Sequence, residues 1–352
     1  MSAHNIIVAI RVRPLSVYEK SKGQAKTTEL NINSDSITIS EKKAKSKTFT
    51  FDHCYDGLVG QQKIYEDIGI PALSHSLDGY DSTIFAYGQA GSGKTFSIMG
   101  DEGNPGLVPR LGKDLFGKID ERLQQAKESG SHIDYLVSIS FLEICDEKIN
   151  DLLNPSSKQL KMNGDYKEGF FVEGLCEIIV RNNDEMMSLI EQGNNIRRIT
   201  ATKIIEQSLC SHACLIMKIE KKTTLKSDGV NRVALVESKL NLVDLGGFEK
   251  SGTKSDKLRV GMNDVSLMAL RNVINALAEG VDTKKNTGEN IPYKDSELTK
   301  LLRKSLGGNT RTTMIATLSP TICDYDKSKN VLKCVNRAKS IENTLIKNEE
   351  KS

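Results

Sequence analysis

Residues 88–95 read GQAGSGKT, which satisfies the phosphate-loop pattern Gly-x4-Gly-Lys-[Ser/Thr]. The pattern follows the apolar stretch Ser82–Tyr87, which has the length and composition of a buried strand. Glycines let successive backbone N–H groups turn toward phosphate oxygens, and the N-terminus of a following helix adds partial positive charge. The lysine of such a loop reaches the terminal phosphates, and the next hydroxyl binds Mg²⁺. These residues predict a nucleoside triphosphate site built around Lys94 and Thr95.

A second segment, Asp244-Leu-Gly-Gly247, suits the same site because it follows the apolar stretch Lys239–Val243. An aspartate at the end of a buried strand can hold the water shell of Mg²⁺, and a nearby glycine N–H can contact the terminal phosphate. Alone, Asp-x-x-Gly usually marks a turn. Beside a phosphate loop it predicts that Asp244 holds the metal through water and that Gly247 senses the phosphate.

The periodicity of apolar residues alternates between strand and helix along the chain. Strands are expected at Asn5–Val12, Ser82–Tyr87, Leu136–Phe141, Ala213–Ile219, Lys239–Val243 and Thr312–Leu318. Helices are expected at Val108–Gln125, Asn183–Gln192, Met262–Glu279, Ser296–Leu306 and Lys329–Ile341. This order predicts one α/β domain with helices on both faces of a sheet.

The composition excludes several classes of protein. Among 352 residues, 49 are Lys or Arg and 46 are Asp or Glu, and this net charge of +3 is too balanced for a protein that coats nucleic acid. No apolar run reaches the length of a membrane helix. The 7 cysteines are odd in number and irregularly spaced, which argues against a disulfide framework. Cys210-Ser-His212-Ala-Cys214 offers three soft ligands, but a structural zinc site needs four and no second pair stands out.

Seven short segments occur in the order of a known family. They are Ile7–Pro14 (IVAIRVRP), Phe85–Thr95, Glu206–His212 (EQSLCSH), Asp244–Glu249 (DLGGFE), Ile291–Ser296 (IPYKDS), Leu306–Asn309 (LGGN) and Asn336–Lys339 (NRAK). Together they resemble the kinesin motor domain over nearly the whole chain, from about residue 5 to residue 341. Val108-Pro-Arg110 and Asp151–Pro155 make it most similar to the vesicle-transport branch, whose motor is N-terminal.

The resemblance implies a central, mostly eight-stranded mixed sheet with helices on both faces, which is the kinesin form of the phosphate-loop NTPase fold. Residues 1–341 would form the motor domain, and residues 342–352 would begin the neck linker. The implied activity is microtubule-stimulated ATP hydrolysis coupled to movement, with ATP or ADP and Mg²⁺ bound. The implied partner is the microtubule, in the cytoplasm and cytoskeleton, with no nucleic acid and no membrane insertion.

The resemblance also assigns site residues. The catalytic set would be Ser208, Ser211, Gly247 and Glu249. The nucleotide would be held by Arg11, Arg13, Pro14, Gln89, Ala90, Gly91, Ser92, Gly93, Lys94, Thr95 and Phe96, and the metal by Thr95 and, through water, Asp244. Tubulin, whose surface is acidic, would meet Lys284, Lys285, Lys294, Lys300 and Arg303.

In this resemblance, switch I corresponds to Ile205–His212 and switch II to the segment that starts at Asp244. Switch I departs from the family pattern Asn-x-x-Ser-Ser-Arg-Ser-His. The second serine, which helps to hold Mg²⁺, is Leu209, and leucine offers no oxygen to a hard cation. The arginine that pairs with the switch II glutamate is Cys210, which leaves Glu249 without its usual partner. A hydrogen bond to a charged group contributes about 1.5–3 kcal/mol, and each 1.36 kcal/mol in a barrier is tenfold in rate, so we expect hydrolysis to be slowed roughly ten- to a hundredfold.

Three smaller departures also predict weakened hydrolysis. Ala90 replaces the family's threonine, Phe248 replaces a small serine, and Asp264 replaces an asparagine. Two hypotheses remain open: a slow ATP-hydrolysing motor, and a microtubule tether that holds nucleotide but barely hydrolyses it. A GTP switch is disfavoured because no Asn-Lys-x-Asp motif occurs. The sequence leaves open the direction of movement, the cargo, the organism, and dimerisation through a stalk outside this chain.

Overall fold

The computed structural model describes residues 2–22, 31–32, 35–40, 46–166, 169–203, 211–227, 230–247, 262–280 and 291–348. Its centre is a nine-stranded mixed sheet, in which eight strands lie side by side and β9 (Lys148–Asp151) pairs with β8 alone. In spatial order the eight are β12 (Ile178–Val180), β8 (His132–Cys145), β13 (His212–Ser227), β14 (Val230–Asp244), β7 (Ser82–Gly88), β15 (Arg311–Leu318), β2 (Ile7–Val12) and β6 (His53–Tyr55). The neighbours from β12 to β14 pair antiparallel and those from β14 to β6 pair parallel, so the predicted mixed sheet is confirmed.

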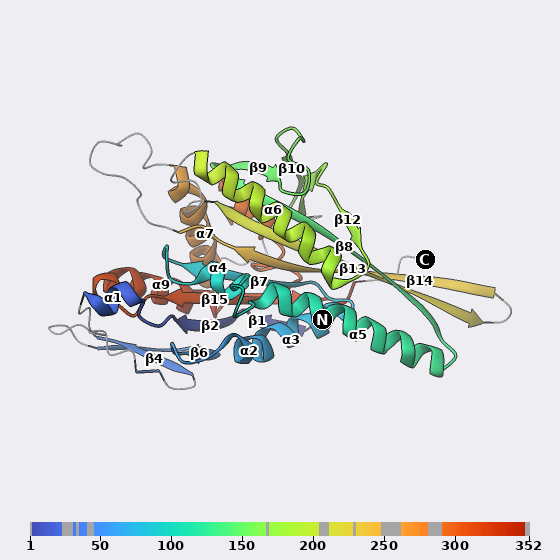
Figure 1. Ribbon diagram of the computed structural model, residues 1–352, viewed down its shortest axis with the longest axis horizontal. Helices are drawn as coiled ribbons and strands as arrows, with labels where there is room; N and C mark the ends of the chain where they lie inside the picture. The colour runs from blue at the N-terminus through green and yellow to red at the C-terminus, as the bar shows by residue number, and fades with distance from the viewer. Residues whose placement is uncertain are drawn as a thin grey trace.

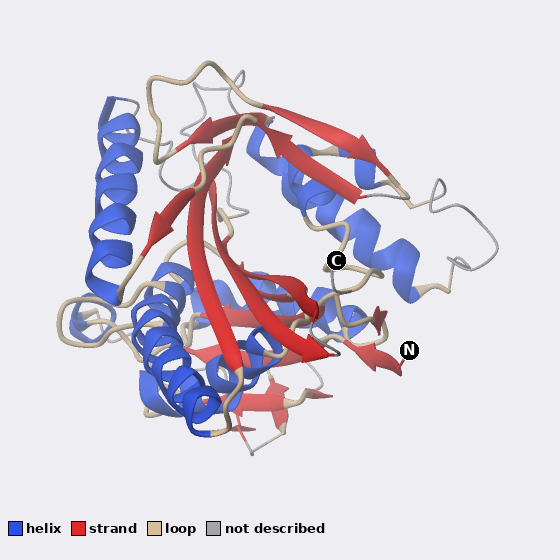
Figure 2. Cartoon of the chain, turned by 90° about the vertical axis from the view of Figure 1, so that its right-hand side faces the viewer, coloured by secondary structure: helices blue, strands red, loops and turns tan. Residues whose placement is uncertain are grey.

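Helices cover both faces of this sheet, as predicted (Figures 1 and 2). On one face lie α3 (Ile70–Leu77), α5 (Leu107–Glu128) and α6 (Asn183–Lys203), and on the other lie α7 (Met262–Ala278), α8 (Glu297–Leu301) and α9 (Tyr325–Ala338). Strand β7 shows why two cores form. Its side chains alternate, so Ile84 and Ala86 join the apolar cluster under α5, whereas Phe85 and Tyr87 join the cluster under α7 and α9.

Shorter elements complete the described chain. The short helices are α1 (Val17–Ser21), α2 (Gln61–Ile64) and α4 (Lys94–Ile98), with single turns at Tyr65–Gly69, Tyr293–Asp295 and Ile322–Asp324. Three small sheets pair β1 (Ser2–Asn5) with β16 (Glu342–Leu345), β10 (Lys161–Asp165) with β11 (Gly169–Glu173), and β4 (Ser36–Ile39) with β3 (Asn31–Ile32) and β5 (Lys47–Thr50). Among the described residues, no helix is both long and apolar enough to cross a membrane.

Several predicted elements differ in extent from the structure. The helix expected over Ser296–Leu306 ends at Leu301, because the chain beyond it turns through i→i−3 hydrogen bonds, from the Arg303 N–H to the Lys300 carbonyl and from the Ser305 N–H to the Leu302 carbonyl. Strands β13 and β14 run far beyond their apolar cores, since the two pair with each other from Ala213 opposite Asp244 to Ser227 opposite Val230. This long hairpin extends past the rest of the molecule at the right of Figure 1. Helix α6 continues past Gln192 to Lys203.

The C-terminal tail lies along the body of the molecule. Residues Glu342–Leu345 pair antiparallel with Ser2–Asn5. Asn348 then donates its N–H to the Gly79 carbonyl at 2.9 Å and its Nδ2 to the Glu237 carbonyl at 2.6 Å. The described part of the tail is therefore held by β1 at one end and by Gly79 and Glu237 at the other.

Candidate functional site

The phosphate loop joins the end of β7 to the start of α4. Gly91 and Gly93 have φ values of 68° and 102°, in the left-handed region that strains any residue with a Cβ. A Cβ at Gly88 would lie 2.4 Å from the Thr317 carbonyl oxygen. The backbone therefore requires glycine at these positions, and the loop's N–H groups surround a pocket because of that geometry.

Lys94 lies within the loop rather than in solvent. Its side chain is buried, and Nζ donates to the carbonyls of Gly88 at 3.0 Å and Gln89 at 2.8 Å. Phosphate oxygens would be stronger acceptors for this ammonium than neutral carbonyls. The loop thus holds the lysine where phosphate would bind.

Thr95 and Asp244 meet at the mouth of the pocket. Strands β14 and β7 are parallel neighbours, so Asp244 ends β14 opposite Ala86, and its Oδ2 accepts the Thr95 hydroxyl at 2.6 Å. The other oxygen, Asp244 Oδ1, is buried and has no hydrogen-bond partner among the described residues. A hydroxyl beside a carboxylate with a free buried oxygen fits Mg²⁺, which prefers oxygen ligands and bound water.

Arg197, on α6, is a site residue that the sequence analysis missed. Its guanidinium lies 3.4 Å from Asp244 Oδ2 and 3.5 Å from Glu143 Oε1, and it donates to the Ser211 hydroxyl at 3.1 Å. No local motif marks this arginine. The available signal was helical spacing, because Ile190, Gly193 and Arg197 share one face once the helix is extended past Gln192.

These parts enclose a pocket of about 260 Å³. It is lined by Ala90, Gly91, Gly93, Lys94, Thr95, Phe96, Arg197, Ser211, Asp244, Leu245, Gly246 and Gly247. A Cβ at Gly247 would lie 2.9 Å from the Ala90 Cβ, so glycine is required where switch II approaches the loop. Most of the predicted phosphate, metal and switch residues are thus brought together.

Five predicted nucleotide residues lie outside the lining of this pocket. Arg11 is buried with its guanidinium bonded to Gln61 and Ser97 and stacked 4.9 Å from the centre of the Phe96 ring, and burial lowers its pKa to about 10. Arg13 pairs with Glu19 at 2.6 Å and donates to the Gly91 carbonyl at 2.7 Å.

The other three have structural contacts. The Ser92 hydroxyl donates to the Gln89 carbonyl at 2.7 Å, and Pro14 lies so close to Gly57 that a Cβ added there would be 3.0 Å from it. The Ser92 hydroxyl, which also lies 2.6 Å from the Thr317 hydroxyl, therefore stabilises the phosphate loop.

His212 is fully enclosed behind the pocket. Burial, together with the nearby charges of Arg197 and Lys94, lowers its pKa to about 3. The imidazole is therefore neutral, and its Nδ1 accepts the N–H of Gly246 at 2.9 Å. His212 thus holds the start of switch II in place.

This buried histidine predicts a pH dependence of stability. Between the folded pKa of about 3 and the ordinary value of 6.5, the unfolded chain binds a proton that the folded chain does not. We expect the free energy of unfolding to fall as the pH drops below 6.5, by up to about 1.4 kcal/mol per pH unit from this group. His212→Asn, which can still accept from Gly246, should remove that share of the slope in urea unfolding at pH 7, 6 and 5. An unchanged slope would contradict this assignment.

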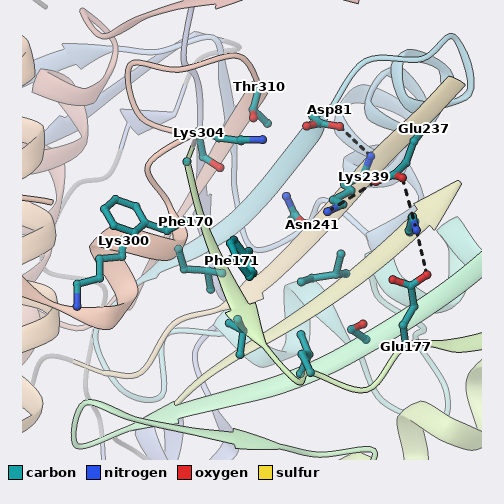
Figure 3. A pocket seen from close by; sticks show the side chains of 18 of the residues that line it. Asp81, Phe170, Phe171, Glu177, Glu237, Lys239, Asn241, Lys300, Lys304 and Thr310 are labelled. Carbon is teal, nitrogen blue, oxygen red and sulfur yellow. Dashed lines mark hydrogen bonds and ion pairs between the residues drawn. The ribbon is translucent and has the colours of Figure 1, made fainter. Parts of the chain in front are cut away.

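A larger hollow of about 750 Å³ lies between the β10–β11 hairpin and the sheet (Figure 3). Its charges are paired internally: Lys218 lies 3.1 Å from Glu177 and 3.5 Å from Glu237. Its lining also holds Asp81 and the lysines Lys239, Lys300 and Lys304, and it does not include the phosphate loop or the Thr95–Asp244 pair that would hold phosphate and Mg²⁺. The smaller pocket at the phosphate loop is the better candidate for nucleotide.

The three described members of the predicted tubulin-facing set lie in or next to α8. Lys294 lies 4.6 Å from the centre of the Tyr166 ring, Lys300 pairs with Glu297 at 2.6 Å, and Arg303 lies 4.8 Å from the centre of the Tyr293 ring. The predicted positions Ser208, Leu209, Cys210, Phe248, Glu249, Lys284 and Lys285 lie outside the described residues.

Comparisons with known proteins agree with this geometry. Kinesin-like protein KIN-12E of Oryza sativa subsp. japonica is 36% identical over 361 residues, which cover 99% of this chain and 18% of that protein. Kinesin-like protein unc-104 of Caenorhabditis elegans is 34% identical over 362 residues, covering 98% and 22%. Human kinesin-like protein KIF1B is 37% identical over 377 residues, covering 99% and 20%. The chain thus spans about a fifth of the length of these relatives.

Two solved structures are similar throughout. The structure of a fast kinesin superposes with a TM-score of 0.85 at 34% identity and covers 99% of this chain and 95% of that one. A KIF14 dimer with AMP-PNP, in complex with a microtubule, gives a TM-score of 0.87 at 31% identity, covering 99% and 97%. The family model described as the kinesin motor domain matches residues 11–341. The phosphate loop, Asp244 and the mixed sheet described above agree with these comparisons, and the chain belongs to the kinesin motor domain family.

Proposed function

We propose that this chain is a microtubule motor domain that binds ATP with Mg²⁺ and hydrolyses it slowly. The observation that carries the proposal is the convergence of Lys94, Thr95 and Asp244 at the adjacent ends of two parallel strands. Bound Mg²⁺ would supply positive charge against the phosphates. Lys94 would hold the terminal phosphates, and Thr95 and Asp244 would hold the metal and its water.

The other residues of the site support this assignment. The exposed Phe96 ring, backed by the Arg11 guanidinium, offers a flat surface for a base. Ser211 and Gly247 line the pocket opposite the phosphate loop, where a terminal phosphate would lie. Ser208 and Glu249 complete the proposed catalytic set by sequence position.

Slow hydrolysis is proposed because switch I has lost two functional groups. Leu209 supplies no oxygen for the metal, and Cys210 supplies no charge to pair with Glu249. Arg197 is the arginine of the described pocket, but its guanidinium already contacts Asp244 and Ser211. We therefore expect nucleotide to bind well and its cleavage to be slow.

The proposed microtubule surface is formed by α7 and α8. Lys294, Lys300 and Arg303 contribute positive charge there, joined in the sequence by Lys284 and Lys285. The structure of KIF14 on a microtubule is that of a similar chain, which supports a microtubule as the partner. Residues 342–352 would be the start of the neck linker, whose described part pairs with β1 and contacts Glu237.

The presence of Leu209 and Cys210 in switch I also favours a second candidate function. The chain would then be a tether that binds nucleotide and microtubules without ATP turnover. Phosphate release from ATP, with and without saturating microtubules, separates the two functions when combined with co-sedimentation. Lys94→Ala, which lacks the phosphate-binding ammonium, provides the background rate. Microtubule stimulation well above that background supports a slow motor. A rate at background with tight co-sedimentation supports the tether, and loss of both would overturn the proposal.

A further inference from the structure

The turn between β8 and β9 holds two consecutive residues in the left-handed conformation. Asp146 has a φ of 51° and Glu147 a φ of 57°, and within the described ranges no other residue apart from glycine has a positive φ. Two-residue hairpin turns of this shape favour Asp-Gly or Asn-Gly, because a Cβ is strained in that region. A glutamate at the second position is therefore less stable than a glycine would be. Such strain points to another task for the side chain.

The carboxylate of Glu147 joins two helices that are distant in the sequence. One oxygen accepts the hydroxyl of Ser266, a buried residue near the start of α7. The other accepts the main-chain N–H of Glu297, the first residue of α8, at 2.6 Å. Hydrogen bonds to an ionised carboxylate are stronger than those between neutral groups. The turn thus fixes the starts of both helices to one side chain.

The same strand also reaches the nucleotide pocket. Glu143, four residues before Glu147 on β8, lies 3.5 Å from Arg197 Nε. Arg197 in turn contacts Asp244 and Ser211 in the pocket. The end of β8 therefore has contacts with the nucleotide site and, one turn later, with α7 and α8.

We propose that Glu147 is a positioning residue that sets the relative placement of α7 and α8, and so the shape of the microtubule-binding surface. This inference rests on the proposed function, which assigns that surface to these two helices. Glu147 acts through Ser266 and the Glu297 amide and does not itself contact nucleotide. The charged side chain of Glu147 stabilises one arrangement of α7 and α8, which a glycine at this position would not hold.

Glu147→Gly separates this role from a general contribution to stability. Glycine relieves the left-handed strain and so offsets part of the stability lost with the two hydrogen bonds, and the thermal midpoint should fall by no more than about a few degrees. It also removes both contacts to α7 and α8, so the dissociation constant for microtubules should rise at least fivefold in co-sedimentation. Affinity for a fluorescent ADP should stay within twofold, because the nucleotide contacts remain. Unchanged microtubule affinity would overturn the proposal.

Two matched variants sharpen the experiment. Glu147→Gln can accept the Glu297 N–H with its oxygen and donate its amide to Ser266 Oγ, so it should bind microtubules within twofold of the unaltered chain. Asp146→Asn changes the neighbouring turn residue and should have no effect. A loss of affinity in Asp146→Asn equal to that in Glu147→Gly would assign the effect to the turn and overturn the role of the carboxylate.

Amide exchange tests the contact without microtubules. Exchange at Glu297 should be at least tenfold faster in Glu147→Gly, and unchanged in Glu147→Gln. If the unaltered chain does not co-sediment with microtubules, the proposed function is wrong, but the exchange experiment still tests the role of Glu147. The exchange result then supports Glu147 as the residue that positions α8, or overturns it if the rate does not change.

Discussion

Leu209→Ser combined with Cys210→Arg should raise microtubule-stimulated ATP turnover at least tenfold. The serine restores an oxygen for Mg²⁺, and the arginine restores a charged partner for Glu249. One charge-assisted hydrogen bond of about 1.5–3 kcal/mol, applied to the barrier, corresponds to a factor of roughly ten to a hundred. Steady-state phosphate release at saturating microtubules measures the effect.

Matched variants show whether the restored groups are the cause. Leu209→Ala removes the bulk of the leucine without adding an oxygen, so its turnover should stay near that of the unaltered chain. Each single restoration should give less than the pair, because the metal and the switch II glutamate act on the same closed state. A double variant with unchanged turnover would remove the proposed explanation of slow hydrolysis.

Arg197→Ala should lower the free energy of unfolding by about 3 kcal/mol, because breaking a buried ion pair leaves a charge without compensation. The carboxylates of Glu143 and Asp244 lie 3.5 and 3.4 Å from this guanidinium, and all three side chains are largely buried. The same change frees Ser211 and Asp244 in the pocket, so ATP turnover should fall as well. Urea unfolding and phosphate release measure the two effects.

The double variant Arg197→Ala with Glu143→Gln tests the physical cause. Replacing the Glu143 carboxylate by an amide removes one of the two uncompensated charges, so part of the lost stability should return. It should not restore turnover, since Asp244 still lacks the Arg197 guanidinium. If the second change destabilises the protein further, Glu143 has another role and the argument from uncompensated charge is wrong.

The phosphate half of the site could be predicted from sequence because its residues are contiguous. Gly91, Gly93, Lys94 and Thr95 form one loop whose glycines are fixed by positive φ, and Asp244 lies at the end of an apolar strand. Parallel pairing of β14 with β7 then brings Asp244 to Thr95. Neither step requires knowledge of distant contacts.

The parts that could not be predicted depend on contacts between distant segments. Arg197 enters the pocket because α6 continues beyond its apolar stripe, and Glu147 contacts residues more than a hundred positions away. The hairpin of β13 and β14 is long because the strands pair, even where their side chains are polar. Arg11, expected to help hold the nucleotide, stacks on the Phe96 ring outside the lining of the pocket. Pairing and tertiary hydrogen bonds decided these features, and periodicity does not reveal them.

Single-turnover cleavage of ATP by the unaltered chain, on saturating microtubules, tests most directly the claim that nucleotide binding is kept and hydrolysis is weakened. Rapid mixing with labelled ATP and acid quench separates the binding step from the cleavage step. We predict ATP binding within tenfold of the Leu209→Ser, Cys210→Arg variant, followed by cleavage at least tenfold slower. Cleavage as fast as in that variant would contradict the claim.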